Sequence, residues 1–218
     1  MYNWKIYNKK KIKLARKFDK FNNKNIFNFV EKSYYNHTRD LFSLFLLSYK
    51  KSNSKILDYG SNVASISNIK NKFNTKNYKF LIYDPFGLNK KIKVNFKNIN
   101  YKIYKNLNLI NEKIDLVNFG SSLQYLSDYN KIFDEIKFKK KSKILITATP
   151  FTLGKEYSSV QKNNYNLDQK INNFSKLIKD FKKKKFNLIF KSSIDLKMAS
   201  IKNLKKNTFF LNLIFEKN

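Results

Sequence analysis

The chain has 218 residues, of which 42% are hydrophobic, and its 46 Lys or Arg against 15 Asp or Glu give a formal net charge of +31. This length and apolar content are enough for one sizeable core in a single domain. Because the chain contains no cysteine, disulfides, thiolate metal sites and cysteine nucleophiles are excluded. No His, Asp and Glu cluster has ligand spacing, so no metal site is predicted.

The positive charge has two interpretations. A strongly basic chain can bind nucleic acid through phosphate contacts. However, only Arg16 and Arg39 among the basic residues are Arg, the residue better suited to bidentate phosphate contacts. Residues with A- and T-rich codons (Lys, Asn, Ile, Phe, Tyr) are abundant, as an AT-rich gene would produce whatever the function. We therefore do not favour nucleic acid as the partner, but keep it as an alternative.

Residues 1–50 are predicted to form an N-terminal helical extension or lid, and residues 51–218 a single globular domain. The apolar run at 41–49 is less than half of the about 20 residues that a membrane-spanning helix needs. It predicts instead a fully buried helix near 36–50. Because the N-terminus also lacks the pattern of a secretory signal, we expect a cytoplasmic protein without a membrane span.

From residue 55 onward, apolar runs alternate with helical patterns. Five runs read as strands, at 55–59, 78–84, 99–105, 113–120 and 142–148. Helices are predicted around 63–73, from a Ser127 cap to Ile136, and from Ile171 to Phe181. Two further runs, at 186–190 and 208–216, close the chain.

Alternation of strand and helix predicts parallel strands joined by right-handed crossovers, with helices on both faces. The last two runs follow each other without room for a long helix, so the final strand is expected to pair antiparallel at or near the edge. The predicted fold class is α/β, a Rossmann-like doubly wound sheet of seven strands.

The stretch KILDYGSNVASISNI places a turn after the first of these strands. Gly60 permits close approach of the backbone to a ligand, Asn62 tolerates a left-handed conformation, and Ala64 stands where a third glycine often packs the helix. Ser61 adds a hydroxyl donor. Without the second and third glycines the turn suits a smaller ligand than a pyrophosphate, which disfavours a dinucleotide oxidoreductase.

Asp84 ends the second strand, 24 residues after Gly60. A carboxylate in this place can accept hydrogen bonds from both ribose hydroxyls of a nucleoside. The alternative is that Asp84, which precedes Pro85, only starts a turn. Its combination with Asp58 and Gly60 favours ribose binding.

The order ILDYGSN, LIYD and IDLVNFGSSLQYLSDY resembles class I S-adenosylmethionine-dependent methyltransferases. More narrowly, GSSLQYLSDYNKIFDEI, ILITATPFT and SVQKNNY are similar to a family of bacterial methyltransferases associated with surface-polysaccharide gene clusters. The resemblance covers roughly residues 30–190. It implies S-adenosylmethionine as cofactor and a small-molecule or saccharide acceptor.

The resemblance also implies roles for particular residues. Asp58, Gly60, Ser61 and Asn62 would contact the methionine portion and the ribose edge, and Asp84 the ribose hydroxyls. The floor beside the sulfonium would be lined by Gly120, Ser121, Ser122 and Gln124. Thr147 and Ala148 replace an Asp-Arg pair of the family, a departure that would change the acceptor or remove activity.

The remaining polar candidates are weaker. Ser121 and Ser122 have no His-Asp partner for nucleophilic catalysis, so a serine hydrolase is disfavoured. His37, the only histidine, is more often a structural residue than a base in such a position. The sequence nominates no catalytic base. The rival function is a catalytically inactive Rossmann-like binding protein that uses its Lys-rich surface against nucleic acid.

Overall fold

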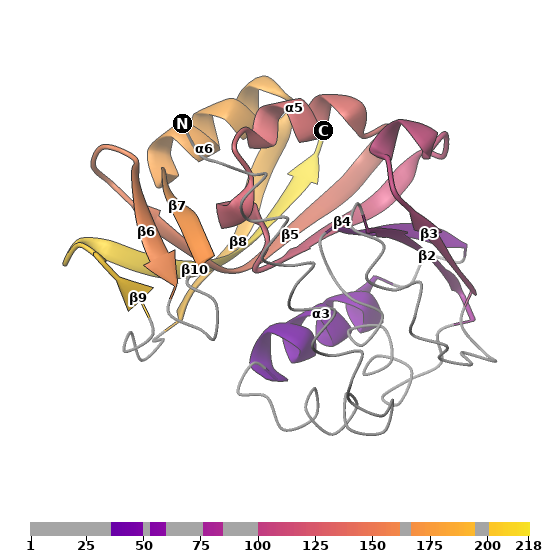
Figure 1. Cartoon of the computed structure of the whole chain (residues 1–218). Helices are drawn as coiled ribbons and strands as arrows, with labels where there is room; N and C mark the ends of the chain where they lie inside the picture. The colour runs from indigo at the N-terminus through magenta and orange to yellow at the C-terminus, as the bar shows by residue number, and fades with distance from the viewer. Residues whose placement is uncertain (1–35, 50–52, 60–75, 85–99, 162–166, 195–200) are drawn as a thin grey trace, which may run out of the picture.

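The computed structural model describes residues 36–49, 53–59, 76–84, 100–161, 167–194 and 201–218. Figure 1 shows one twisted sheet with α5 and α6 on one face and α3 on the other. The elements in chain order are α3 (Asn36–Ser48), β1 (Ser54–Tyr59), β2 (Tyr78–Tyr83), β3 (Asn100–Tyr104), η2 (Leu107–Leu109), β4 (Ile114–Gly120), η3 (Leu123–Tyr125), α5 (Tyr129–Glu135), β5 (Phe138–Thr152), β6 (Tyr157–Gln161), β7 (Leu167–Asn173), α6 (Phe174–Lys183), β8 (Phe186–Ile194), β9 (Ile201–Lys202) and β10 (Thr208–Lys217).

The sheet has the predicted doubly wound arrangement. Strands β3, β2, β1, β4 and β5 lie side by side in this order and are parallel. The last strand, β10, is antiparallel to both of its neighbours, β5 and β8. These seven strands confirm the predicted class, with the final strand one place in from the edge strand β8.

Three strands were not predicted and bring the sheet to ten. Strands β6 and β7, which lie between β5 and α6 in the chain, form an antiparallel extension together with β9, which follows β8. The extension lies at the opposite end of the sheet from β2 and β3 (Figure 1). Only two residue pairs, Phe151 with Asn172 and Thr152 with Asn173, join β7 to β5. Because SSVQ and LDQKINN carry few apolar residues, hydrophobic periodicity could not identify them as strands.

Because of the extension, the following helix begins later in the chain than the sequence predicted. Ile171, expected in a helix, is a buried residue of β7. Helix α6 begins at Phe174 because the Asn173 side chain accepts a hydrogen bond from the Lys176 amide at 2.7 Å and so caps it. A similar correction applies to α5, which is capped by Asp128 and not by Ser127. The Asp128 carboxylate accepts from the Asn130 amide at 2.9 Å.

Two apolar layers hold the sheet and helices together. One lies between the sheet and α5 and α6, where Phe181 packs against Phe133 and Phe215 at ring-centroid distances of 4.7 and 4.3 Å. The other contains Phe42, Phe45 and Leu46 of α3. The prediction that this helix is buried all round was wrong, because α3 packs on the sheet through one face only. On its other face Leu44 and Leu47 are 62% and 46% exposed.

Some predictions concern residues that are not described. Residues 1–35 of the predicted N-terminal extension and the helix at 63–73 lie outside the described residues. The domain division at residue 50 stays a prediction.

Candidate functional site

Polar side chains meet where the central parallel strands end. Asp58 of β1 is in register with Ile82 of β2 on one side and with Asn118 of β4 on the other. Register partners in a sheet point to the same face, and Ile82 belongs to the apolar layer under α3. Asp84 follows Ile82 by two positions. Asp58, Asp84 and Asn118 are thus placed on the α3 face at the carboxyl edge, the expected ligand position in such sheets.

Asp58 is held by a neighbouring strand. The Asn118 Nδ2 donates a hydrogen bond of 2.9 Å to Asp58 Oδ1, and both residues are buried. The backbone amide of Asp84 donates a hydrogen bond to the Tyr104 carbonyl at 2.8 Å. This bond fixes the backbone that positions the buried Asp84 carboxylate.

A third buried acid, Asp115, is neutralised by an ion pair within the protein. Asp115 lies near the opposite end of β4, where its Oδ2 accepts from the Lys139 ammonium at 2.5 Å and from the Lys55 amide at 2.9 Å. Lysine neutralises it there. Asp58 and Asp84 lie instead at the carboxyl edge, where carboxylate oxygens can accept hydrogen bonds from the donors of a ligand.

Ser121 and Ser122 form hydrogen bonds between the ends of neighbouring strands. Ser122 Oγ donates to the Tyr59 carbonyl at 2.9 Å, and the Ser121 amide and Oγ donate to the Thr147 carbonyl at 3.1 and 3.3 Å. These bonds join the end of β4 to β1 and β5. Beside them, a side chain at Gly120 would lie 3.4 Å from Asn118 Nδ2, a tight fit that favours glycine. Through these hydrogen bonds the two serines fix the end of β4 against its neighbours.

The backbone is strained at two of these strand ends. Ser121 and Ala148 adopt positive φ angles of 53° and 45°, which non-glycine residues rarely take. Ala148 lies at a bulge of β5, where its amide donates to Asn212 Oδ1 of β10 at 3.0 Å. Such strain is concentrated at functional sites in proteins. Thr147 and Ala148 therefore lie on a strained piece of backbone.

Several buried polar atoms at this edge have no hydrogen-bond partner among the described residues. They are Asn118 Oδ1, Gln124 Oε1, Thr147 Oγ1 and both side-chain amide atoms of Asn172. A buried polar atom without a partner costs about 1–3 kcal/mol, so a concentration of them indicates a place where a ligand or water binds. The sequence analysis missed Asn118 and Asn172. The one signal for Asn118 was a polar residue between the apolar residues Val117 and Phe119 of β4.

Some predicted site residues are not tested. Gly60, Ser61 and Asn62 lie outside the described residues. His37 lies in α3, and the expectation that it is a structural residue stays a prediction. Within the described ranges, no three His, Asp or Glu side chains gather closely enough to hold a metal ion. The same part of the chain has no helix of the length and apolarity needed to cross a bilayer.

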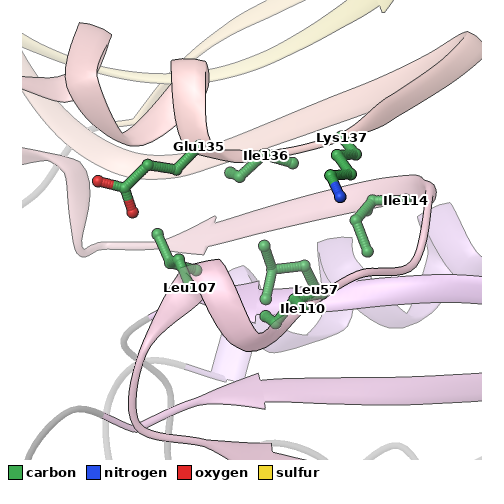
Figure 2. A pocket seen from close by; sticks show the side chains of 7 residues that line it. All are labelled: Leu57, Leu107, Ile110, Ile114, Glu135, Ile136 and Lys137. Atoms are coloured by element: carbon green, nitrogen blue, oxygen red, sulfur yellow. The ribbon is translucent and has the colours of Figure 1, made fainter.

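An apolar gap elsewhere in the molecule is not part of this site. It lies between η2, the start of β4 and the end of α5, and Figure 2 shows Leu57, Leu107, Ile110 and Ile114 around it. The space between the atoms is about 170 Å³ and opens partly to solvent. Glu135 and Lys137 also line it (Figure 2), but the gap has no room for even a water-sized ligand, so we interpret it as a packing gap.

The fold matches solved structures of methyltransferases. The chain is similar to a SAM-dependent methyltransferase from Methanosarcina mazei (11% identity, 79% of this chain and 96% of that chain, TM-score 0.56) and to one from Clostridium acetobutylicum (13%, 94% and 98%, 0.55). It is also similar to the magnesium protoporphyrin IX methyltransferase of Synechocystis with bound SAH (11%, 84% and 82%, 0.56).

The sequence comparisons add no closer relative. No protein-family model matches the chain, and no curated protein matches its sequence. At these identities the structural likeness establishes the fold. The chain has the Rossmann-like fold of class I S-adenosylmethionine-dependent methyltransferases.

Proposed function

We propose that the protein is an S-adenosylmethionine-dependent methyltransferase. The observation that carries this proposal is the pair of buried carboxylates, Asp58 and Asp84, at the carboxyl ends of β1 and β2 in a methyltransferase fold. Carboxylates accept hydrogen bonds from ammonium and hydroxyl groups, which the methionine and ribose parts of S-adenosylmethionine present. Structures of this fold that contain the demethylated product support the choice of cofactor.

Different residues at the carboxyl edge would bind different parts of S-adenosylmethionine. Asp84 would accept from the ribose hydroxyls, and Asp58, fixed by Asn118, would face the methionine portion together with the turn at Gly60, Ser61 and Asn62. Gly120, Ser121 and Ser122 would form the adjoining floor. S-adenosylmethionine supplies an electrophilic methyl group on a sulfonium.

The transfer itself would depend mainly on alignment. The acceptor atom forms a bond to the methyl carbon while the carbon–sulfur bond breaks, so sulfur leaves as a neutral thioether and the acceptor loses a proton to solvent or to a base. Such an in-line displacement needs donor and acceptor held together in a dry site. The apolar layers on both sides of β1 and β4 would exclude water from it.

The acceptor is proposed to be a small molecule, with a saccharide as the specific candidate. The magnesium protoporphyrin IX and 1,6-didemethyltoxoflavin-N1 methyltransferases, two neighbours in structure, are named for small-molecule substrates. The resemblance of SSLQY and ATPFT to the polysaccharide-associated family supports the saccharide.

Thermal unfolding with and without cofactor tests the proposal. A ligand that binds only the folded state, present at about 100 times its Kd, stabilises the protein by about 2.7 kcal/mol. For a domain of this size that corresponds to an increase in Tm of roughly 5–10 °C. S-adenosylmethionine should produce this increase and NADH should not. An increase with NADH alone would overturn the proposal, whereas salt-dependent RNA binding without any cofactor effect would favour the inactive binding protein.

A further inference from the structure

The most unusual buried side chain outside the cofactor residues is Asn172, near the end of β7. It is 1% exposed, and neither its Nδ2 nor its Oδ1 has a hydrogen-bond partner among the residues that the structure describes. An amide has two donors and can accept two bonds, so burying it unpaired is costly. A structural role would require partners, and the described surroundings provide none.

Asn172 lies on the same face of the sheet as η3. Its register partner on β5 is Phe151, which belongs to the apolar layer under α5 and α6 together with Leu123 of η3. The short helix η3 packs against β7 and β5. Its Gln124 is 4% exposed and has an Oε1 without a partner in the same described region. The unpaired amide of Asn172 and the unpaired amide oxygen of Gln124 thus come from two elements that pack on each other.

The polar groups around them are paired. Gln169 Nε2 of β7 donates to Ser159 Oγ of β6 at 3.0 Å, and Tyr125 of η3 is hydrogen-bonded to Gln161 of β6. The unpaired amides therefore do not reflect a generally poor hydrogen-bond network in this extension. They are specific exceptions within an ordered polar arrangement.

The buried side chains of this region carry no charge. In β5, β6, β7 and η3 every buried side chain is apolar, a hydroxyl or an amide. The nearby Glu156 is paired with Lys170 at 2.8 Å and with Lys176 at 3.6 Å. A charged ligand would lose its hydration here without gaining a counter-charge, whereas hydroxyl and amide groups would find complementary partners.

We propose that Asn172 and Gln124 form a hydrogen-bonding subsite for an uncharged acceptor that carries hydroxyl or amide groups. The subsite lies near the carboxyl ends of β5 and β7, on the face of the sheet that α5 and α6 cover, and it gives the β6–β7 extension a role in acceptor recognition. This inference rests on the proposed methyltransferase function. It reassigns Gln124 from the cofactor floor to the acceptor.

The first experiment compares thermal unfolding of two matched substitutions. Asn172→Leu and Gln124→Met remove unpaired amides and should leave Tm unchanged or raise it by about 2–4 °C. Gln169→Met, which breaks the bond to Ser159, should lower Tm by a similar amount. A decrease for Asn172→Leu and Gln124→Met equal to that for Gln169→Met would show that these amides are structural and would overturn the inference.

The second experiment measures ligand binding by saturation-transfer NMR with S-adenosylhomocysteine present. The uncharged probes are glucose and N-acetylglucosamine, and the charged probes of the same ring size are glucosamine and glucuronate. We expect the uncharged probes to bind and Asn172→Leu to abolish their binding. Preference for a charged probe, absence of binding by both uncharged probes, or unchanged binding to Asn172→Leu would each contradict the subsite.

A separate titration with S-adenosylhomocysteine distinguishes this inference from the function on which it rests. If the folded wild-type protein does not bind the product, the methyltransferase proposal itself fails. If wild type and Asn172→Leu bind it equally but the probe results are negative, only the acceptor subsite fails.

Discussion

The Asn118 amide and the Asp58 carboxylate are joined by a hydrogen bond of 2.9 Å that links the ends of β4 and β1. Both side chains are buried on the face covered by α3. A buried donor to a carboxylate contributes to stability and also fixes the direction of the carboxylate oxygens.

Asn118→Leu should therefore destabilise the protein. The substitution leaves the Asp58 carboxylate without this donor, and we expect the free energy of unfolding to fall by about 1–3 kcal/mol in urea denaturation. Asn187→Leu on the exposed part of β8 is the matched control and should change stability by less than about 0.5 kcal/mol. Equal stability of Asn118→Leu and wild type would contradict a role for this bond.

Asp84→Asn should weaken cofactor binding. Hydrogen bonds to a charged acceptor contribute about 1.5–3 kcal/mol, so we expect the Kd for S-adenosylhomocysteine to increase roughly 10- to 100-fold. Equilibrium dialysis measures the change. Asp134→Asn on α5, where the side chain is 67% exposed, should leave the Kd unaltered. An unchanged Kd for Asp84→Asn would remove Asp84 from the site.

Glu112 should make stability depend on pH in the acid range. Hydrogen bonds from Lys55 and then Lys79, at 2.8 and 2.7 Å, lower the pKa of Glu112 below its ordinary value of 4.5. A lowered pKa in the folded state stabilises the protein above the ordinary value and ceases to do so as pH falls through the lowered one.

Glu112→Gln therefore should cost about 0.5–1 kcal/mol at pH 7, and this difference from wild type should shrink as the pH falls below about 4.5. Urea denaturation at several pH values gives the comparison. A difference that stays constant with pH would show that the carboxylate charge is not responsible.

Phe181→Ala should be among the most destabilising single substitutions in α6. The ring is 1% exposed and contacts Phe133 and Phe215, so its removal leaves a cavity between the helix and the sheet. We expect a loss of about 3–5 kcal/mol in the free energy of unfolding. Leu153→Ala, at a side chain that is 66% exposed, serves as the control and should stay within about 0.5 kcal/mol of wild type.

The sequence predicted the parts of the fold that depend on local apolar patterns. The strands from β1 to β5 are apolar runs, and the carboxyl ends of parallel neighbours meet at one edge, so the placement of Asp58 beside Asp84 followed from pattern and topology together. The full burial of α3 was predicted wrongly, because composition does not reveal that only one face of a helix meets the sheet.

Asn118 and Asn172 could not be identified in the same way. Asn118 is important because its strand happens to lie in register with Asp58, and register is a non-local property. Asn172 lies in a polar strand that exists only through its pairing with β6 and β5. Strand formation of this kind depends on neighbours more than on intrinsic preference.

Isothermal titration of the intact wild-type chain with S-adenosylhomocysteine tests the central claim most directly. If the carboxyl edge of β1, β2 and β4 is a cofactor site, the product should bind saturably with a stoichiometry of about one, and Asp84→Asn should bind it more weakly. Folded protein that releases no heat with the product at any accessible concentration, and that shows no change in Tm with it, would contradict the account.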